Sequence, residues 1–209
     1  MNRYQNSISL FSYVTLALLF VGLVTSCQRE NRGKQKVLRQ LIVQPFSDIP
    51  TARVDFVVRS LSGQFPGIIV KKQIDLPDAA YTRARNRWRA DSIIQFLDRR
   101  TADGSITIGL TSKDISVTTE SAQDWGVMGL GFRPGKACVA SCFRLSKLNT
   151  DSQLFKVAIH EIGHTEGLPH CPATTCFMRD AEGKNRTDML TSFCDKCKAR
   201  LVNKGWHLL

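Results

Sequence analysis

Apolar residues in this chain fall into short runs with two kinds of spacing. The stretch Leu38–Phe46, with three consecutive aliphatic residues, and the β-branched stretch Ser105–Leu110 have the length and composition of buried strands. Between them, apolar residues recur every three or four positions from Val54 to Leu61, which predicts a helix that Gly63 ends. By the same criteria we expect further strands at Ile68–Leu76 and Cys138–Leu145, and further helices at Ala79–Arg100, Asp151–Thr165 and Ser192–Lys204. Alternation of strands and helices predicts an α/β fold, with a mostly parallel sheet covered by helices.

The predicted helix Ala79–Arg100 is unusually rich in arginine. Asp78 is placed to cap it, and apolar positions such as Trp88 and Leu97 could form its buried stripe. We expect its arginines to form a solvated face, with a surface for lipid headgroups or a partner as the alternative.

The first 26 residues have the pattern of an export signal. Arg3 supplies a positive charge, Ile8–Val24 is apolar, and Val24–Cys27 resembles a bacterial lipobox. This resemblance implies cleavage before Cys27, a lipid on its sulfur and a membrane-anchored lipoprotein of the bacterial cell envelope. The alternative is one uncleaved membrane helix, for which the apolar run is at the short limit. Residues 27–37 are polar and are expected to tether the lipid to a catalytic domain at 38–209.

The chain of 209 residues is basic, with a formal net charge of +11. Its length and ordinary hydrophobic content suit one compact domain, which we expect to be a monomer. A basic surface could favour anionic headgroups or acidic substrates, or keep the protein soluble. We expect no nucleic-acid partner, because no recognition motif is present.

The chemistry of the chain is concentrated between His160 and Cys171. His160 and His164 are four residues apart, so on a helix both imidazoles can reach one zinc ion. Glu161 is placed to take a proton from a zinc-bound water. Gly167 can adopt the left-handed conformation that ends a helix, and His170 can then supply a third nitrogen. Three protein ligands leave a fourth position open for water, as a catalytic zinc requires.

The seven cysteines divide into three groups. One is the lipid-attachment candidate, and four form two close pairs that are typical of a tetrahedral structural zinc site. The expected ligands of this site are Cys171, Cys176, Cys194 and Cys197. Cys138 and Cys142 remain, and the sequence leaves open whether they form a disulfide or are two small buried thiols. A straight strand would hold them too far apart to bond.

These residues together match the HExxHxxGxxHCx4CxM…CxxC motif of the archaemetzincins, the archaelysin-like zinc metallopeptidases. The motif positions are His160, Glu161, His164, Gly167, His170, Cys171, Cys176, Met178, Cys194 and Cys197. The resemblance implies a metzincin-like fold in which Met178 forms the turn below the catalytic zinc. It also implies an antiparallel edge strand above the cleft, which we place at Trp125–Phe132. The zinc site would lie between an upper lobe at 38–167 and a lower lobe at 168–209 that a structural zinc staples.

The sequence therefore predicts a peptidase with two zinc ions per chain, one catalytic and one structural, which acts on peptides or proteins with Glu161 as the general base. The alternative is a catalytically silent zinc-binding envelope lipoprotein that serves as an interaction module. An intact Glu161 argues against that alternative, because a scaffold needs no base there. Glu166 is expected to be a solvated carboxylate or a neighbour of the ligands, and His207 to be solvated. The identity of the substrate and the choice between exo- and endopeptidase stay open.

Overall fold

A computed structural model describes residues 40–120, 122–206 and 208 of the chain. These residues belong to one compact unit. The predicted signal segment, Cys27 and the tether lie outside this range. Within it, no helix combines the length and apolar character that a membrane crossing requires.

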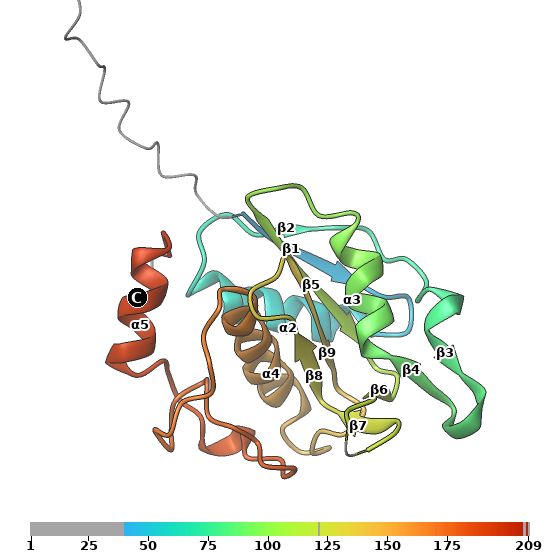
Figure 1. The fold of residues 1–209 in the computed structure, drawn as a ribbon. Coiled ribbons are helices and arrows are strands. Elements are labelled where there is room, and N and C mark those ends of the chain that lie inside the picture. The colour runs from blue at the N-terminus through green and yellow to red at the C-terminus, as the bar shows by residue number, and fades with distance from the viewer. Residues whose placement is uncertain (1–39, 121, 207, 209) are drawn as a thin grey trace, which may run out of the picture. The chain divides into compact units, whose positions relative to one another are not determined.

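The main sheet has five strands in the order β2-β1-β5-β9-β8 (Figure 1). Strands β1 (Gln40–Pro45), β2 (Ile69–Val70), β5 (Ser105–Thr111) and β9 (Ala137–Ser141) are parallel, whereas β8 (Gly129–Gly131) is antiparallel to β9. All residues of β5 are buried, as the β-branched stretch predicts for a central strand. The predicted mixed, mostly parallel sheet is thus confirmed.

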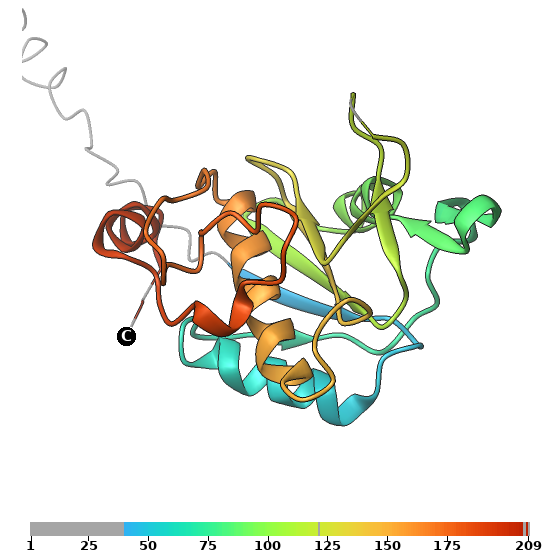
Figure 2. The same ribbon diagram turned by 90° about the horizontal axis from the view of Figure 1, so that it is seen from below.

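Helices cover both faces of this sheet (Figure 2). Helices α2 (Thr51–Ser62) and α4 (Thr150–Thr165) pack with Cys138 and Ala140 of β9 on one face. Helix α3 (Ala90–Asp98) packs with Ala137 and Val139 of the same strand on the other face. Successive residues of β9 therefore point into two separate apolar cores, which is the side-chain alternation that a strand buried on both faces requires.

The prediction of one helix over Ala79–Arg100 is wrong for its first half. That segment forms two short 3₁₀ turns, Asp78–Ala80 and Arg83–Arg85, and two strands, β3 (Tyr81–Thr82) and β4 (Arg87–Arg89). They belong to a second sheet with the order β3-β4-β6-β7, completed by β6 (Ile115–Val117) and β7 (Trp125–Val127).

Ion pairs explain why this arginine-rich segment is extended. Asn86 takes a left-handed conformation, with φ at +53°, which interrupts any helix. The guanidinium of Arg87 then donates to Asp114 at 2.8 Å and to the carbonyl oxygen of Asp124 at 2.6 Å. These contacts with distant residues outweigh the helix propensity of the segment, which is a weak preference.

The expected edge strand over Trp125–Phe132 is divided between the two sheets. Val127 pairs with Ile115 in the second sheet, whereas Gly129 pairs with Ala140 in the main sheet. Only β8 forms the antiparallel edge of the main sheet, and its outer side has no partner strand among the described residues.

The strand predicted at Cys138–Leu145 ends at Ser141. The next residue, Cys142, donates its backbone N–H to Thr111. Cys138 and Cys142 are both buried free thiols, so the disulfide alternative is not found.

The segment after α4 contains little regular structure beyond a 3₁₀ turn (Thr187–Met189) and α5 (Asp195–Asn203), which begins three residues later than predicted. Trp206 fixes its end to the domain. The indole ring packs edge-on against Phe65, with centroids 3.8 Å apart, and its N–H donates to Glu166 at 3.1 Å. Glu166 is 1% exposed, so the prediction of a solvated carboxylate is wrong, and the side chain links the end of α4 to the C-terminal segment. His207 lies outside the described residues.

Candidate metal centres and active site

Helix α4 presents two imidazoles from its last turns and then ends sharply. The Gly167 N–H donates to the carbonyl of His164, and the Leu168 N–H donates to that of Gly163. Gly167 has φ of +87°, which glycine adopts without steric cost and which other residues rarely adopt. The chain reverses here, as the sequence predicts, and brings His170 back to the helix.

The three imidazoles converge through the same ring atom. Nε2 of His164 is 3.0 Å from Nε2 of His160 and 3.3 Å from Nε2 of His170. Nitrogens about 2.05 Å from a tetrahedral zinc lie roughly 3.3 Å from one another, so the spacing fits three corners of one such coordination sphere. The donor set and its geometry therefore fit a zinc ion with one position left open.

Each ring is oriented through its other nitrogen. Nδ1 of His160 lies 2.6 Å from the Phe177 carbonyl oxygen, and Nδ1 of His164 lies 2.8 Å from that of Leu168. Nδ1 of His170 lies 3.1 Å from a carboxylate oxygen of Asp180. Burial lowers the pKa of His160 to about 3 and also lowers the pKa of His164. Neutral rings with Nδ1–H held by an acceptor keep Nε2 free for a metal.

Glu161 lies next to this triad and is almost completely buried, at 7% exposure. Burial raises the pKa of its carboxyl group to about 8. Two glycines of β8 make room for it. A Cβ at Gly129 would lie 2.6 Å from Oε1 of Glu161, and one at Gly131 would lie 2.7 Å from its carbonyl oxygen. The sheet edge can therefore approach the helix closely only because both positions lack a side chain.

Met178 lies below the helix in a buried turn. Its sulfur is so close to α4 that a Cβ at Gly163 would lie 2.4 Å from it. The neighbouring residue Phe177 supplies the carbonyl that holds His160. This turn therefore supports the triad from below, which is the position that the metzincin resemblance implies for Met178.

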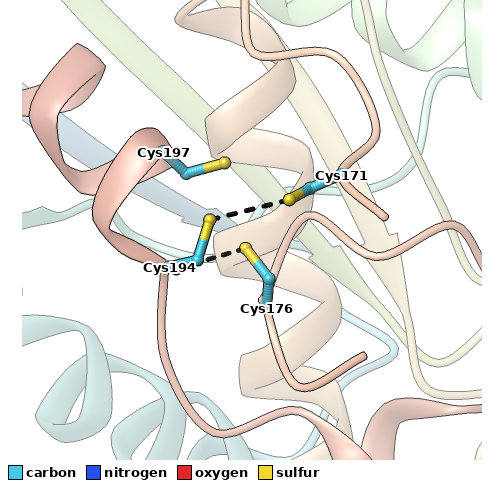
Figure 3. A group of neighbouring side chains, drawn as sticks. All are labelled: Cys171, Cys176, Cys194 and Cys197. Carbon is cyan, nitrogen blue, oxygen red and sulfur yellow. Dashed lines mark hydrogen bonds between the residues drawn. The ribbon is translucent and has the colours of Figure 1, made fainter. Parts of the chain in front are cut away.

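Four cysteines form a second cluster (Figure 3). The Cys171 and Cys194 sulfurs are 3.6 Å apart, far from bonding distance but close to the roughly 3.8 Å expected of two thiolates on one zinc. The backbone N–H groups of Met178 and Cys194 both point to the sulfur of Cys176, at 3.5 and 3.4 Å. All four are free thiols, and their sulfurs lie within 4.8 Å of one another, with Cys197 as the fourth. The set fits a closed tetrahedral zinc site.

A cleft of about 820 Å³ opens in front of the histidine triad. One wall is the edge strand β8, and the other is the loop at residues 179–187. Gln153 of α4 holds this loop in place: its carbonyl accepts from Asn185 at 2.8 Å, and its amide donates to Asp188 at 2.9 Å.

The structure brings together every described residue that the motif singles out, and it adds several that sequence reasoning missed. The spacing of the histidines does not point to Asp180, Gln153, Gly129 or Gly131. Two further contacts are made by backbone carbonyls, which no side-chain pattern reveals. The only available signal is the position of Asp180, two residues after Met178.

We expect the Asp180→Asn variant to bind the triad zinc about 10- to 100-fold more weakly, because the amide cannot stabilise the basic Nε2 of His170 as a carboxylate does. Competition with a chromophoric chelator measures this affinity. The exposed Asp103→Asn serves as the control. Unchanged zinc affinity in Asp180→Asn would show that the contact has no role in holding the metal.

A buried carboxylate beside three converging imidazoles, over a methionine turn and under an open sheet edge, defines a zinc metallopeptidase of the metzincin kind. The family model for Peptidase family M54 matches residues 43–203, and the chain belongs to this family. It is thus a metallopeptidase, a hydrolase of the archaemetzincin family.

Known archaemetzincins are similar over most of the chain. The protein from Halobacterium salinarum is 28% identical over 170 residues, which cover 75% of this chain and 95% of the relative. The one from Methanopyrus kandleri is 31% identical over 135 residues, which cover 62% and 74%. The crystal structure of the M. kandleri archaemetzincin has a TM-score of 0.69 at 26% identity and covers 81% of this chain and 97% of that one. That of the Archaeoglobus fulgidus protein, complexed with malonate, has a TM-score of 0.66 at 27% identity and covers 77% and 99%. These likenesses confirm the predicted fold class.

Proposed function

We propose that this protein hydrolyses peptide bonds with Glu161 as the general base and binds two zinc ions, one between His160, His164 and His170 and one between the four clustered cysteines. The convergence of three Nε2 atoms beside a buried carboxylate carries the proposal: that of His164 lies 3.0 and 3.3 Å from those of His160 and His170. An interaction module would need a folded zinc site but no buried carboxylate in an open cleft.

Zinc, when held by the three imidazoles, supplies a Lewis acid that activates water and polarises a carbonyl oxygen. Glu161 accepts the proton that the attacking water loses and returns it to the leaving amine. Burial raises the pKa of this carboxyl group, which makes its carboxylate a stronger proton acceptor. Gly129 and Gly131 keep the carboxylate in position.

The open edge of β8 gives the substrate a place to bind. Its outer side borders the cleft and lacks a neighbouring strand among the residues described. An extended peptide can pair with such an edge through main-chain hydrogen bonds. The bond to be cleaved would then lie beside β8, next to the carboxylate of Glu161.

A mixed fluorogenic peptide library tests the proposal. The zinc-loaded protein should cleave library members, lose activity when a chelator removes the triad zinc, and regain it when zinc is returned. Absence of turnover by a protein that contains two zinc ions per chain would favour the silent interaction module instead.

We expect Gly129→Ala to lower kcat about a hundredfold, because the new methyl group would displace the carboxylate of Glu161 by a fraction of an ångström or more. Zinc content should not change. Gly63→Ala is the matched control, since its Cβ would make only an ordinary contact at 3.6 Å. Equal rates in both variants would show that the close approach of β8 does not position the base.

We also propose that the chain is a bacterial envelope lipoprotein anchored through Cys27. This rests on the N-terminal sequence pattern alone. Metabolic labelling with a radioactive fatty acid should mark the wild type and not Cys27→Ala, and the label should fractionate with membranes. Equal labelling of both proteins would contradict the anchor.

A further inference from the structure

The walls of the active-site cleft carry far more positive than negative charge. Two acidic residues line it, and both have other tasks: Glu161 serves the reaction, and Asp180 holds His170. Six cationic residues line it, contributed by the turn after β8, the segment after β9, α4 and the loop opposite β8. They are Arg133, Arg144, Lys156, Arg179, Lys184 and Arg186.

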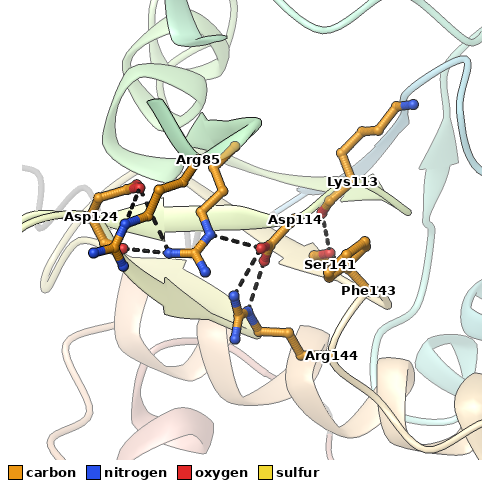
Figure 4. A network of polar contacts seen from close by, with 8 residues as sticks. Arg85, Lys113, Asp114, Asp124, Ser141, Phe143 and Arg144 are labelled. Carbon is orange, nitrogen blue, oxygen red and sulfur yellow. Dashed lines mark hydrogen bonds and ion pairs between the residues drawn. The ribbon is translucent and has the colours of Figure 1, made fainter. Parts of the chain in front are cut away.

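Arg144 is fixed at one end of the cleft by Asp114 (Figure 4). Its Nε and one terminal nitrogen donate to the two oxygens of Asp114, at 2.7 and 2.8 Å. The guanidinium lies flat against Gly126 of β7, where a Cβ would come within 2.1 Å of it. Asp114 also accepts from Arg87 at 2.8 Å, and Arg87 and Arg85 face Asp124 at 3.7 and 3.8 Å, so three guanidinium groups share two carboxylates. The Arg144 guanidinium is therefore held rigidly, and the group of arginines and aspartates around it keeps a net positive charge.

The loop opposite β8 repeats this arrangement. Glu182 accepts from Arg179 at 3.2 Å and from Arg186 at 2.8 Å, so again one carboxylate serves two arginines. Lys184, between them, is exposed and has no carboxylate partner within the described part of the chain.

Two further cations lie on the side of α4. Lys156 is one helical turn before His160, and it reaches only the carbonyl oxygen of Asp188, at 3.5 Å. Arg133 is exposed in the turn after β8, which is tied to the end of α4 by the hydrogen bond from the Gly135 N–H to the Thr165 carbonyl. Neither pairs with a carboxylate among residues 40–120 and 122–206. Cations thus surround the triad from three sides.

We propose that this cleft selects acidic peptides, in which aspartate or glutamate side chains flank the bond to be cleaved. Lys156 and Lys184 receive carboxylates on the side of the loop at residues 179–187, and Arg133 and Arg144 receive those toward the two ends of β8. This selectivity deepens the proposed function and rests on it. It follows from charge complementarity, which raises both affinity and association rate when an excess of positive charge lines one concave surface.

Two fluorescent peptides of the same sequence, one with two glutamates and the other with two glutamines at these positions, test the proposal. Their binding to the zinc-loaded Glu161→Gln variant is measured by anisotropy, and kcat/KM is measured with the wild type. We expect the acidic peptide to bind about tenfold more tightly at low salt, since each exposed pair contributes only a few-fold. High salt should remove most of this preference.

The double variant Lys156→Gln/Lys184→Gln should reduce the preference to about threefold or less. The matched control is Lys71→Gln, an exposed lysine beside β2 at the opposite edge of the sheet, which should keep the full preference. Equal affinity for the two peptides would overturn the proposal. A loss of preference in Lys71→Gln as large as that in the double variant would do the same. A retained binding preference without cleavage of either peptide would contradict the peptidase function and leave the charge selectivity standing.

Discussion

Replacing Glu161 with glutamine is expected to lower kcat/KM for any cleaved peptide by about 10²- to 10⁴-fold, the range that a lost general base produces. Glutamine has nearly the same shape and fits the pocket beside Gly129 and Gly131, but it cannot accept the proton from the attacking water. Because the carboxylate is not one of the three converging imidazoles, zinc content should equal that of the wild type. Initial rates, together with metal analysis of the same samples, measure both quantities.

The control is Glu120→Gln, which removes a carboxylate from an exposed position outside the cleft and should keep full activity. Comparable rates in Glu161→Gln and the wild type would exclude Glu161 as the base. Loss of zinc from Glu161→Gln would instead assign the carboxylate to the metal site.

Removing two ligands of the cysteine cluster is expected to produce the largest loss of stability. The variant Cys176→Ser/Cys197→Ser should lose the structural zinc, and its free energy of unfolding should fall by on the order of 5 kcal/mol or more, since metal binding at such a site contributes directly to folding. Both side chains are buried in the core that α5 and Trp206 complete. Denaturant unfolding and zinc stoichiometry measure the effect.

This variant should also bind the catalytic zinc less tightly. Cys171 directly follows His170, and Cys176 directly precedes Phe177, whose carbonyl orients His160. Cys142→Ser is the matched control: its thiol is also buried, but it lies outside the cluster, next to the hydroxyl of Ser112 at 3.3 Å. Unchanged stability and two zinc ions in the double variant would show that the cluster holds no structural metal.

The central strand, the active-site helix and the turn at Gly167 could be predicted because each follows from local chemistry. The stretch Ser105–Leu110 is β-branched and buried on both faces, the two histidines share a helical face, and glycine relieves the positive φ that ends α4. The convergence of His170 on the other two rings follows from the same turn. For these elements, local preference and final structure agree.

The errors arise where distant residues decide the local conformation. The segment around Arg87 looks helical in isolation, but Asp114 and Asp124 hold it as a strand. Glu166 looks like an exposed carboxylate next to the motif, yet Trp206, 40 residues later, buries it. The space for Glu161 depends on how closely two glycines of β8 approach α4, and such a distance between elements cannot be obtained from spacing along the chain.

The order of the metal ligands along the polypeptide has a consequence for biosynthesis. His170 is the last of the three histidines along the chain. The next residue, Cys171, belongs to a cluster that also needs Cys194 and Cys197. A chain that ends before these two cysteines contains all three imidazoles but lacks two of the four sulfurs that surround the residue next to His170. The last imidazole is therefore steadied by the cluster only after helix α5 has been made.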